Sequence, residues 1–320
     1  MNLKKIQNSI STIQIFTLAY LSVIFINIIN PLYTNAFPLY AQQGYDDPRE
    51  ATGRIVCANC HLAQKPVQIE SPKSVLPNTV FETTVKIPYS SNNEQILGNG
   101  KKGPLNMGAV LILPDGFKLA PKNLISEELK EKTRGVYIQP YSKSRENILV
   151  VGPMPGNKNK EIVFPILSPD PSKDKSIHFL KYPIYVGGNR GRGQINPTGN
   201  KSNNNTITSA YTGKVTNIKT LDKGDRNIEI LQSNGDTLTQ TIPSGLDLII
   251  SENNNIVVNQ NITNDPNLGG FGQNETEIVL QSPQRIKGMI AFFFTVTLAQ
   301  ILFVLKKKQW EKVQAAEMNF

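Results

Sequence analysis

Cysteine and histidine are scarce in this chain of 320 residues, which has two of each. Both cysteines, Cys57 and Cys60, lie next to one of the histidines, His61, and His178 is the only further Cys or His. A structural zinc site usually takes four such ligands, so these numbers weigh against zinc. The sequence also shows no internal repeat, no P-loop and no nucleophile motif. Its acidic residues show no pairing that indicates a catalytic site.

A strong excess of positive charge is also missing from the body of the chain. The whole sequence has a net charge of +9, but residues 37–284 hold 26 basic and 23 acidic residues, a net charge of only +3. This distribution predicts no binding to nucleic acid. The lysines at 306–308 are better explained as a membrane-topology signal.

Long apolar runs occur only near the two ends. At the first end, Lys4 and Lys5 precede an apolar run over residues 13–29, and small residues follow up to Ala36. This order predicts an export signal over residues 1–36 that is cleaved after Ala36, with a retained membrane anchor as the alternative.

The second apolar run covers residues 286–305. About twenty apolar residues span a bilayer core of about 30 Å as a helix, so we expect a transmembrane helix here, with a buried core helix as the alternative. Lysines follow at once, and positive charge stays on the side of synthesis. The body is therefore predicted to be exported, and the tail, residues 306–320, to stay behind.

The stretch "CANCH" at residues 57–61 has the C-x-x-C-H pattern of covalent c-type haem attachment. The two thiols form thioethers with the haem, and the adjacent imidazole binds the iron from one face. A dithiol redox pair and half of a zinc site are the alternatives. No βαβ pattern accompanies the motif, as a thioredoxin-like pair would require.

Candidates for the opposite face of the iron are few. Met107, Met154 and His178 lie in the predicted exported body, and each has an ordinary explanation as a packing or structural residue. Cleavage after Ala36 would add a fourth candidate, the new α-amino group of Phe37, whose reference pKa is near 8. From the residues alone this amine is possible but not favoured.

The body of the chain has the sequence pattern of an all-β protein. Short apolar runs are separated by Gly, Pro and Asn, which predicts an elongated antiparallel β-sandwich over residues 37–203. One helix is expected near residues 126–133, with Ser126 as its N-cap. A small β domain is expected over residues 204–267, with one hairpin around Asn234-Gly235 and a second over residues 246–262. Residues 268–284 then return to the large domain as a strand.

Four segments together resemble the cytochrome f family, the large c-type subunits of the photosynthetic cytochrome bf complex. They are "FPLYAQQGYDDPREATGRIVCANCHLAQKPV" (37–67), "FLKYPIYVGGNRGRGQINP" (179–197), "NLGGFGQNETEIVLQSP" (267–283) and the C-terminal residues 298–320. The resemblance implies one covalently bound haem c, a large and a small β domain, and one membrane helix. It also implies that the amine of Phe37 is the distal ligand. Many members have Tyr at this position, so Phe keeps the ring and loses the hydroxyl.

The resemblance assigns roles to two further groups of residues. An internal water chain would be lined by Gln95, Asn189, Arg192, Gln194 and Asn204. A basic patch for an acidic electron acceptor would include Lys101, Lys102 and Lys223. Glu94 stands where plant members have a lysine, so we expect a weak patch and a shallow salt dependence.

The implied role is a one-electron relay without a catalytic site of its own. The Rieske iron–sulfur protein would be the donor, plastocyanin or a small soluble c-type cytochrome the acceptor, and cytochrome b another subunit of the complex. The chain would cross the thylakoid membrane once, with its body in the lumen and its tail in the stroma, or in the cytoplasm of a cyanobacterium. A haem peroxidase or reductase with an open sixth site is one rival function, and an anchored binding module with a structural haem is another.

Overall fold

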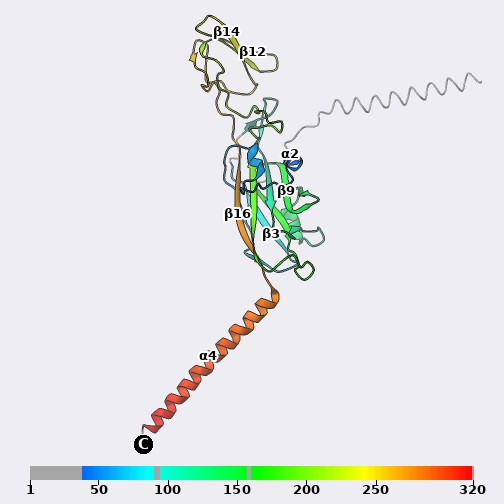
Figure 1. Ribbon diagram of the computed structural model, residues 1–320, viewed down its shortest axis with the longest axis vertical. Helices are drawn as coiled ribbons and strands as arrows, with labels where there is room; N and C mark the ends of the chain where they lie inside the picture. The colour runs from blue at the N-terminus through cyan, green and yellow to red at the C-terminus, as the bar shows by residue number, and fades with distance from the viewer. Residues whose placement is uncertain (1–37, 90–93, 157–159, 319–320) are drawn as a thin grey trace, which may run out of the picture. The chain divides into compact units, whose positions relative to one another are not determined.

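The computed structural model describes residues 38–89, 94–156 and 160–318 (Figure 1). The predicted signal segment, residues 1–36, and Phe37 lie outside these residues. Short helical elements are α2 (Leu39–Gly44), the 3-10 helix η1 (Val56–Asn59) and α3 (Glu127–Lys132). Ser126 caps α3 by accepting a hydrogen bond from the backbone N–H of Leu129, so the helix predicted here is confirmed.

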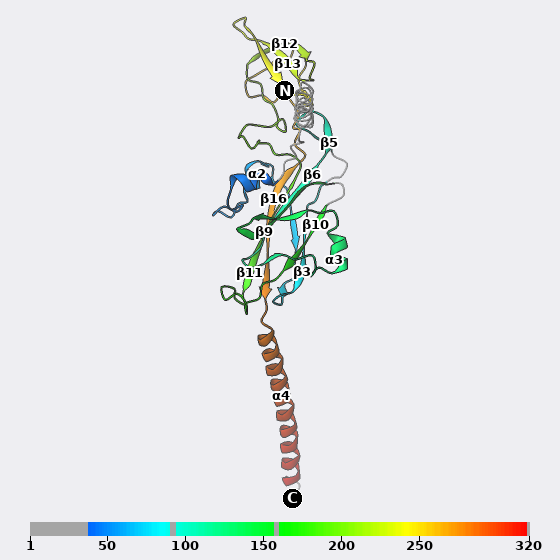
Figure 2. The same ribbon diagram turned by 90° about the vertical axis from the view of Figure 1, so that its right-hand side faces the viewer.

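Two sheets pack face to face as a sandwich (Figures 1 and 2). The first has the strand order β1-β3-β10-β7, with bounds Gln68–Glu70, Val80–Lys86, Glu161–Leu167 and Lys118–Leu119. The second has the order β2-β16-β11-β6-β9-β8, with bounds Ser74–Val75, Gly270–Leu280, Lys181–Arg190, Asn106–Ile112, Arg145–Pro155 and Ile138–Ser142. All pairs are antiparallel except β2 with β16. The all-β sandwich predicted from the sequence is therefore confirmed.

The six-stranded sheet is buried on both faces. Because side chains alternate along a strand, β11 sends Ile184 and Val186 into the core between the two sheets. The other face of the same sheet carries a second apolar cluster, which we call the outer cluster. Its buried members are Ile55, Val110, Tyr141, Ile148, Val150 and Phe271. The chain around the C-x-x-C-H motif covers this outer face.

A third sheet has its own core. Its order is β14-β13-β12-β15, with bounds Thr237–Ile242, Arg226–Leu231, Gly213–Thr220 and Asn255–Ile256. The hairpin predicted around Asn234-Gly235 is confirmed as the β13–β14 connection, where Gly235 takes a positive φ of 89°. The second predicted hairpin is present only at its ends, where Leu248 pairs antiparallel with Thr263 and the Ile249 N–H donates to the Ile262 carbonyl at 3.1 Å; between them, β15 pairs with β12. A two-stranded ribbon of β4 (Glu94–Ile96) and β5 (Lys102–Pro104) adds Ile96 to this core.

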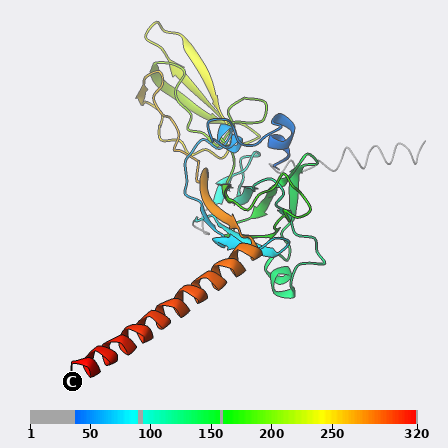
Figure 3. The ribbon, with the colours of Figure 1, turned by 60° about the horizontal axis from the view of Figure 1, so that its bottom comes forward.

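The chain leaves this small sheet and enters β16, which pairs with β11 over ten residues in the six-stranded sheet. The predicted boundaries at residues 203, 267 and 284 stay predictions. The helix α4 (Pro283–Glu317) follows as one continuous element (Figure 3). Ser282 caps it by accepting from the Arg285 N–H, and Pro283 occupies its first turn, where no N–H is needed.

Helix α4 is the one helix among the described residues that is long and apolar enough to cross a membrane, and it is not buried against the rest of the chain. It extends beyond the predicted span of residues 286–305 into the tail. The residues from Leu305 to Glu317 include no Gly or Pro, so the helix continues out of the apolar segment.

Candidate haem-binding site

The C-x-x-C-H residues lie on one side of a tight turn. Element η1 contains Cys57, and both Cys60 and His61 donate their backbone N–H to the Cys57 carbonyl, at 3.2 and 3.0 Å. Residues spaced i, i+3 and i+4 on a helical turn share a face. The sequence spacing thus brings two thiols and one imidazole together, as covalent attachment of a haem requires.

Two segments that are distant in the sequence hold this turn in place. Before it, the N–H of Ile55 donates to Oε1 of Gln273 on β16, at 3.0 Å. After it, the carbonyl of Cys60 accepts from the N–H groups of Gln194 and Ile195, at 2.8 and 3.2 Å. A Cβ on Gly193 would lie 3.0 Å from the same carbonyl. Glycine therefore allows the segment of residues 193–195 to approach the motif closely.

The ring of His61 has one nitrogen with a partner and one without. The amide Nδ2 of Asn189 on β11 lies 3.1 Å from Nε2. Nδ1 is shielded from solvent and has no hydrogen-bond partner. Burial lowers the pKa of His61 to about 4, so the imidazole is neutral at pH 7 and offers a lone pair. A metal ligand needs a neutral imidazole of this kind, with its second nitrogen held by another group.

The two thiols suit conversion to thioethers. Both are free and half-buried. Burial raises the pKa of Cys57 to about 12 and also raises that of Cys60, which disfavours the thiolate at both positions. A thioether is uncharged, so it can occupy this apolar setting without the cost of a buried charge. The described ranges contain no group of three His, Cys, Asp or Glu side chains that could bind a metal ion.

Met107 and Met154 are separated from His61 by the six-stranded sheet. Both are buried in the core between the two sheets, and they pair with each other across β6 and β9. His61 instead contacts Asn189 on the outer face. Neither methionine can therefore reach the metal side of His61 in this fold, and both are packing residues.

His178 is also remote from the motif. It is exposed, and its backbone carbonyl accepts a hydrogen bond from the Tyr182 hydroxyl at 2.7 Å. The seven residues from Tyr182 to Asn189 extend about 23 Å along β11. With both methionines also excluded, none of the side-chain alternatives raised by the sequence is near His61.

Phe37 lies outside the described residues, but the chain that follows it packs against the motif. Helix α2 begins at Leu39, and its Ala41 packs on the outer cluster, as do Cys57 and Ala58. Figures 1 and 2 both draw α2 close to β9 of the same sheet. The first described residues are therefore beside the candidate haem site.

Four of the five residues assigned to the water chain, Gln95, Arg192, Gln194 and Asn204, form one hydrogen-bonded network, and the fifth, Asn189, contacts His61 nearby. Gln194 is buried, and its Oε1 accepts from the Leu62 N–H at 2.8 Å, directly after His61. Buried Gln95 accepts from the Arg192 N–H at 2.8 Å, and buried Asn204 donates to the Arg192 carbonyl at 2.9 Å. The structure brings these residues together, and their role in holding water stays a prediction.

Asn267 is among the members of this network that the sequence interpretation missed. Asn267 Oδ1 accepts from Asn204 Nδ2 and from the Gly269 N–H, both at 3.1 Å. Asn204 Oδ1 is buried without a partner, so the network contains an acceptor that a water molecule could satisfy. Nothing in the local sequence marks Asn267, since 63 residues separate it from Asn204.

Lys101, Lys102 and Lys223, which we call the docking lysines, gather around one serine. A Cβ on Gly100 would meet Ser244 Oγ at 2.2 Å, and a Cβ on Gly224 would meet Ser244 Cβ at 3.3 Å. Lys101 follows Gly100 directly, Lys102 comes next, and Lys223 precedes Gly224; all three lysines are exposed. Within the described ranges none of them forms an ion pair, although Asp222 and Glu94 are nearby in the sequence. Their role in docking stays a prediction.

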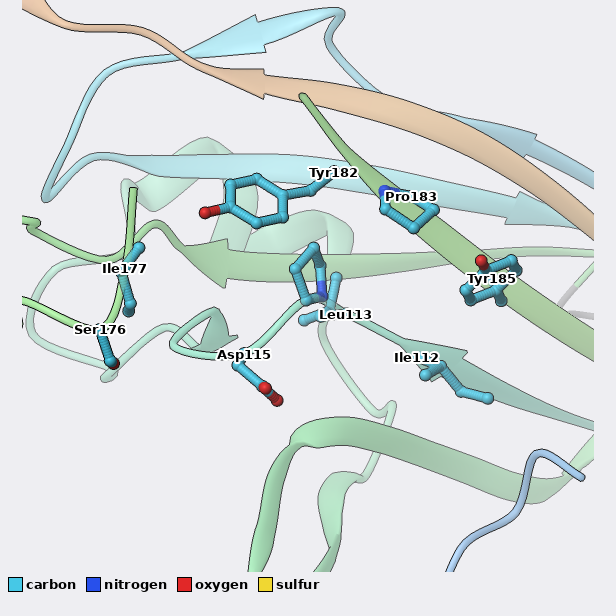
Figure 4. Close-up of a pocket in the computed structure, with 9 residues that line it drawn as sticks. Ile112, Leu113, Asp115, Ser176, Ile177, Tyr182, Pro183 and Tyr185 are labelled. Atoms are coloured by element: carbon cyan, nitrogen blue, oxygen red, sulfur yellow. The ribbon is translucent and has the colours of Figure 1, made fainter. Parts of the chain in front are cut away.

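A pocket of about 420 Å³ lies on β6 and β11, away from this site. Figure 4 shows Tyr182, Pro183 and Tyr185 along one strand, with Asp115 and Ser176 across from them. It contains none of the predicted site residues. The candidate site is therefore defined by the motif and its neighbours rather than by this pocket.

Comparison with known proteins agrees with the geometry. Residues 37–191 match the family model "Apocytochrome F, N-terminal", and residues 203–320 match "Apocytochrome F, C-terminal". A protein named cytochrome f from Gracilaria tenuistipitata var. liui is 69% identical over 308 residues, which cover 96% of this chain and 99% of that protein. The cytochrome f of Porphyra purpurea is 67% identical over 94% of each chain, and that of Cyanophora paradoxa is 56% identical over 99% of each.

Proposed function

Since the chain belongs to the cytochrome f family, we propose that it relays single electrons from a Rieske iron–sulfur protein to plastocyanin or a small soluble c-type cytochrome. Membership of the family makes the chain a haem-carrying electron-transfer subunit of the cytochrome bf complex. With α4 it is a single-pass membrane protein. The donor, the acceptor and the association with cytochrome b are part of the proposal.

One haem is held covalently by Cys57 and Cys60, with His61 as the proximal ligand. When bound, it supplies the one-electron couple on which the relay depends. The observation that carries this assignment is the state of the His61 ring. It is neutral, held at one nitrogen by Asn189, and shielded but without a partner at the other.

The distal ligand is the α-amino group of Phe37, freed by cleavage after Ala36. Three observations support it. The match to the N-terminal family model begins at residue 37. Helix α2, which starts two residues later, packs on the outer cluster, as Cys57 does. Met107, Met154 and His178 all lie away from His61. With protein groups bound to the iron on both sides, no substrate would bind it, and the subunit would have no separate catalytic site.

The body of the chain lies in the thylakoid lumen, and the C-terminal tail lies in the stroma or in a cyanobacterial cytoplasm. The lysines directly after the apolar part of α4 support this orientation. The network from Leu62 through Gln194 to Arg192 and Gln95 holds an internal water chain. The docking lysines form a weak surface for the acceptor.

Mass spectrometry of the mature chain and an absorption spectrum of the purified protein test the ligand assignment together. We expect a mature chain that begins at Phe37 and a six-coordinate, low-spin iron that resists cyanide. A fully coordinated protein whose chain begins upstream, or whose first amine is acetylated, would exclude the amine ligand. Rapid cyanide binding would instead favour an enzyme with an open site.

A further inference from the structure

Strand β16 leads directly into the membrane helix α4, and its last residues are fixed from both sides. The N–H of Leu280 donates to the Leu180 carbonyl at 3.0 Å, and the N–H of Gln281 donates to the Val75 carbonyl at 2.9 Å. The next residue, Ser282, is the N-cap of α4. The sandwich therefore holds the chain up to the residue at which the helix begins.

The bilayer that α4 crosses must begin close to this point. The apolar run starts at Ile286, four residues after Ser282. A helix rises about 1.5 Å per residue, so the two residues are about 6 Å apart along α4. The headgroup region on each side of a bilayer core is itself about 5–8 Å thick. Residues level with Ser282 are therefore at the height of the lipid headgroups.

Two exposed leucines lie at this level. Leu76 follows β2 and is 42% exposed, and Leu180 precedes β11 and is 53% exposed. Strands β2 and β11 both pair with the last residues of β16, one on each edge of it. The leucines therefore flank the chain where it enters the membrane. A single exposed leucine needs no explanation, but a pair beside a membrane helix can be covered by lipid.

A loop over residues 168–180 connects the two leucines. It begins at Ser168, whose hydroxyl donates to the Leu76 carbonyl at 2.7 Å, and it ends at Leu180. Ser168 is buried, so this end of the loop is anchored in the sandwich. The loop and the two leucines therefore belong to one end of the large domain.

This end of the domain is mildly basic. We call it the membrane-proximal face, and it consists of residues 73–79, 168–180 and 281–287. These residues include two aspartates and five exposed basic side chains, a net charge of +3; the basic ones are Lys73, Lys173, Lys175, Arg285 and Lys287. Basic side chains at this height are attracted to anionic headgroups.

We propose that the membrane-proximal face rests on the bilayer surface, with Leu76 and Leu180 among the lipid headgroups and the basic side chains against anionic ones. This contact depends only on a membrane-crossing α4, and not on the proposed donor, acceptor or iron ligands. Lipid contacts on both sides of β16 limit how far the large domain tilts about the start of the helix. The helix by itself would leave that tilt free.

Spin labels on introduced cysteines test this contact in the full-length, haem-loaded protein, reconstituted into nanodiscs of phosphatidylcholine and anionic phosphatidylglycerol. Leu76→Cys and Leu180→Cys each provide one free thiol, because the proposed thioethers occupy Cys57 and Cys60. Leu268→Cys is the matched control, since Leu268 is also exposed, at 39%, and lies just before β16. The eleven residues of β16 place it about 33 Å from the membrane end of the strand.

We expect the labels at positions 76 and 180 to lose most of the relaxation by a water-soluble nickel complex that the label at 268 retains. Neutral lipid in place of phosphatidylglycerol should weaken this protection, and unchanged protection would overturn the part given to the basic side chains. Equal nickel relaxation of all three labels would overturn the lipid contact. Protection that appears in the assembled complex but not in nanodiscs would also overturn it, because another subunit would then cover the face.

Discussion

Replacement of Asn189 by leucine should raise the midpoint potential of the haem. The amide of Asn189 lies 3.1 Å from a ring nitrogen of His61. A metal-bound imidazole is neutral and carries its proton on the nitrogen that does not bind the metal. In the structure Nδ2 of Asn189 faces Nε2 of His61; rotating the amide by half a turn would present Oδ1 to an N–H at this nitrogen. This bond makes the imidazole a stronger donor, which favours the oxidised iron, and leucine of similar size would remove it.

The magnitude follows from the worth of one hydrogen bond. A net contribution of about 0.5–1.5 kcal/mol, if it is made mainly to the oxidised state, corresponds to a rise of about 20–65 mV for one electron. The side chain is half-buried, so the contact is only partly screened by water. Leucine also leaves the ring N–H without a protein acceptor, which acts in the same direction.

A redox titration followed by the haem absorption band measures this change. Asn147→Leu is the control, because Asn147 makes an amide-to-carbonyl bond to Leu113 at 2.8 Å on the same sheet without contact to His61. The potential of the control should equal that of the unaltered protein. An unchanged or lower potential in Asn189→Leu, with His61 still bound, would refute the argument that this amide tunes the ligand.

Three further predictions concern packing, docking and alkaline stability. Gly272→Ala should lower the free energy of unfolding by about 2–3 kcal/mol in thermal melts, because the new Cβ would lie 1.9 Å from the Lys65 carbonyl. The control is Gly44→Ala, whose new Cβ would meet no atom within 4 Å. Equal melting temperatures of the two variants would contradict the reasoning. Replacement of all three docking lysines by glutamine should slow reduction of the acceptor only a few-fold, since the body carries a net charge of only +3. For the same reason the rate in the unaltered protein should depend only weakly on salt. A steep fall of its stopped-flow rate with added salt would be inconsistent with this. Burial raises the pKa of Tyr141 to about 12, so the stabilising effect of its protonated hydroxyl is complete below pH 10 and is lost as the pH rises through about 12. Between pH 9 and 12 the melting temperature should therefore fall more steeply for the unaltered protein than for Tyr141→Phe. Parallel curves of melting temperature against pH would count against this role of the hydroxyl.

The motif and the strand pattern could be read from the sequence because both depend on local spacing. The C-x-x-C-H spacing places Cys57, Cys60 and His61 within one turn of chain, in which Cys60 and His61 both donate their N–H to the Cys57 carbonyl. Ser126 likewise caps α3 through a bond to a residue only three positions away. Asn234-Gly235 forms its hairpin because Gly235 adopts the positive φ that the turn requires.

The exclusion of the methionines needed the structure, since it depends on which face of the sheet each occupies. The pairing of β6 with β9 shifts register between Met107 and Ala109. The alternation of apolar residues along one strand therefore does not tell which side chains of the paired strand lie on the same face of the sheet. The inner part of the second predicted hairpin was wrong for a related reason, although its ends do pair. Asn255 and Ile256 pair with β12, some forty residues earlier, and no local sequence pattern predicts this pairing.

The end of β11 shows why the site depends on tertiary structure rather than on the motif. Asn189 faces the outer cluster and contacts His61, whereas the next residue, Arg190, faces the core and donates through Nη2 to the Pro66 carbonyl. Arg190 is only 2% exposed, and although burial lowers its pKa to about 10, it stays charged at neutral pH. Two adjacent residues therefore hold the chain at His61 and again five residues later, from opposite faces of one sheet. A C-x-x-C-H segment in an unfolded peptide has the same ligands but nothing to fix the imidazole, so control of the iron must come from this strand.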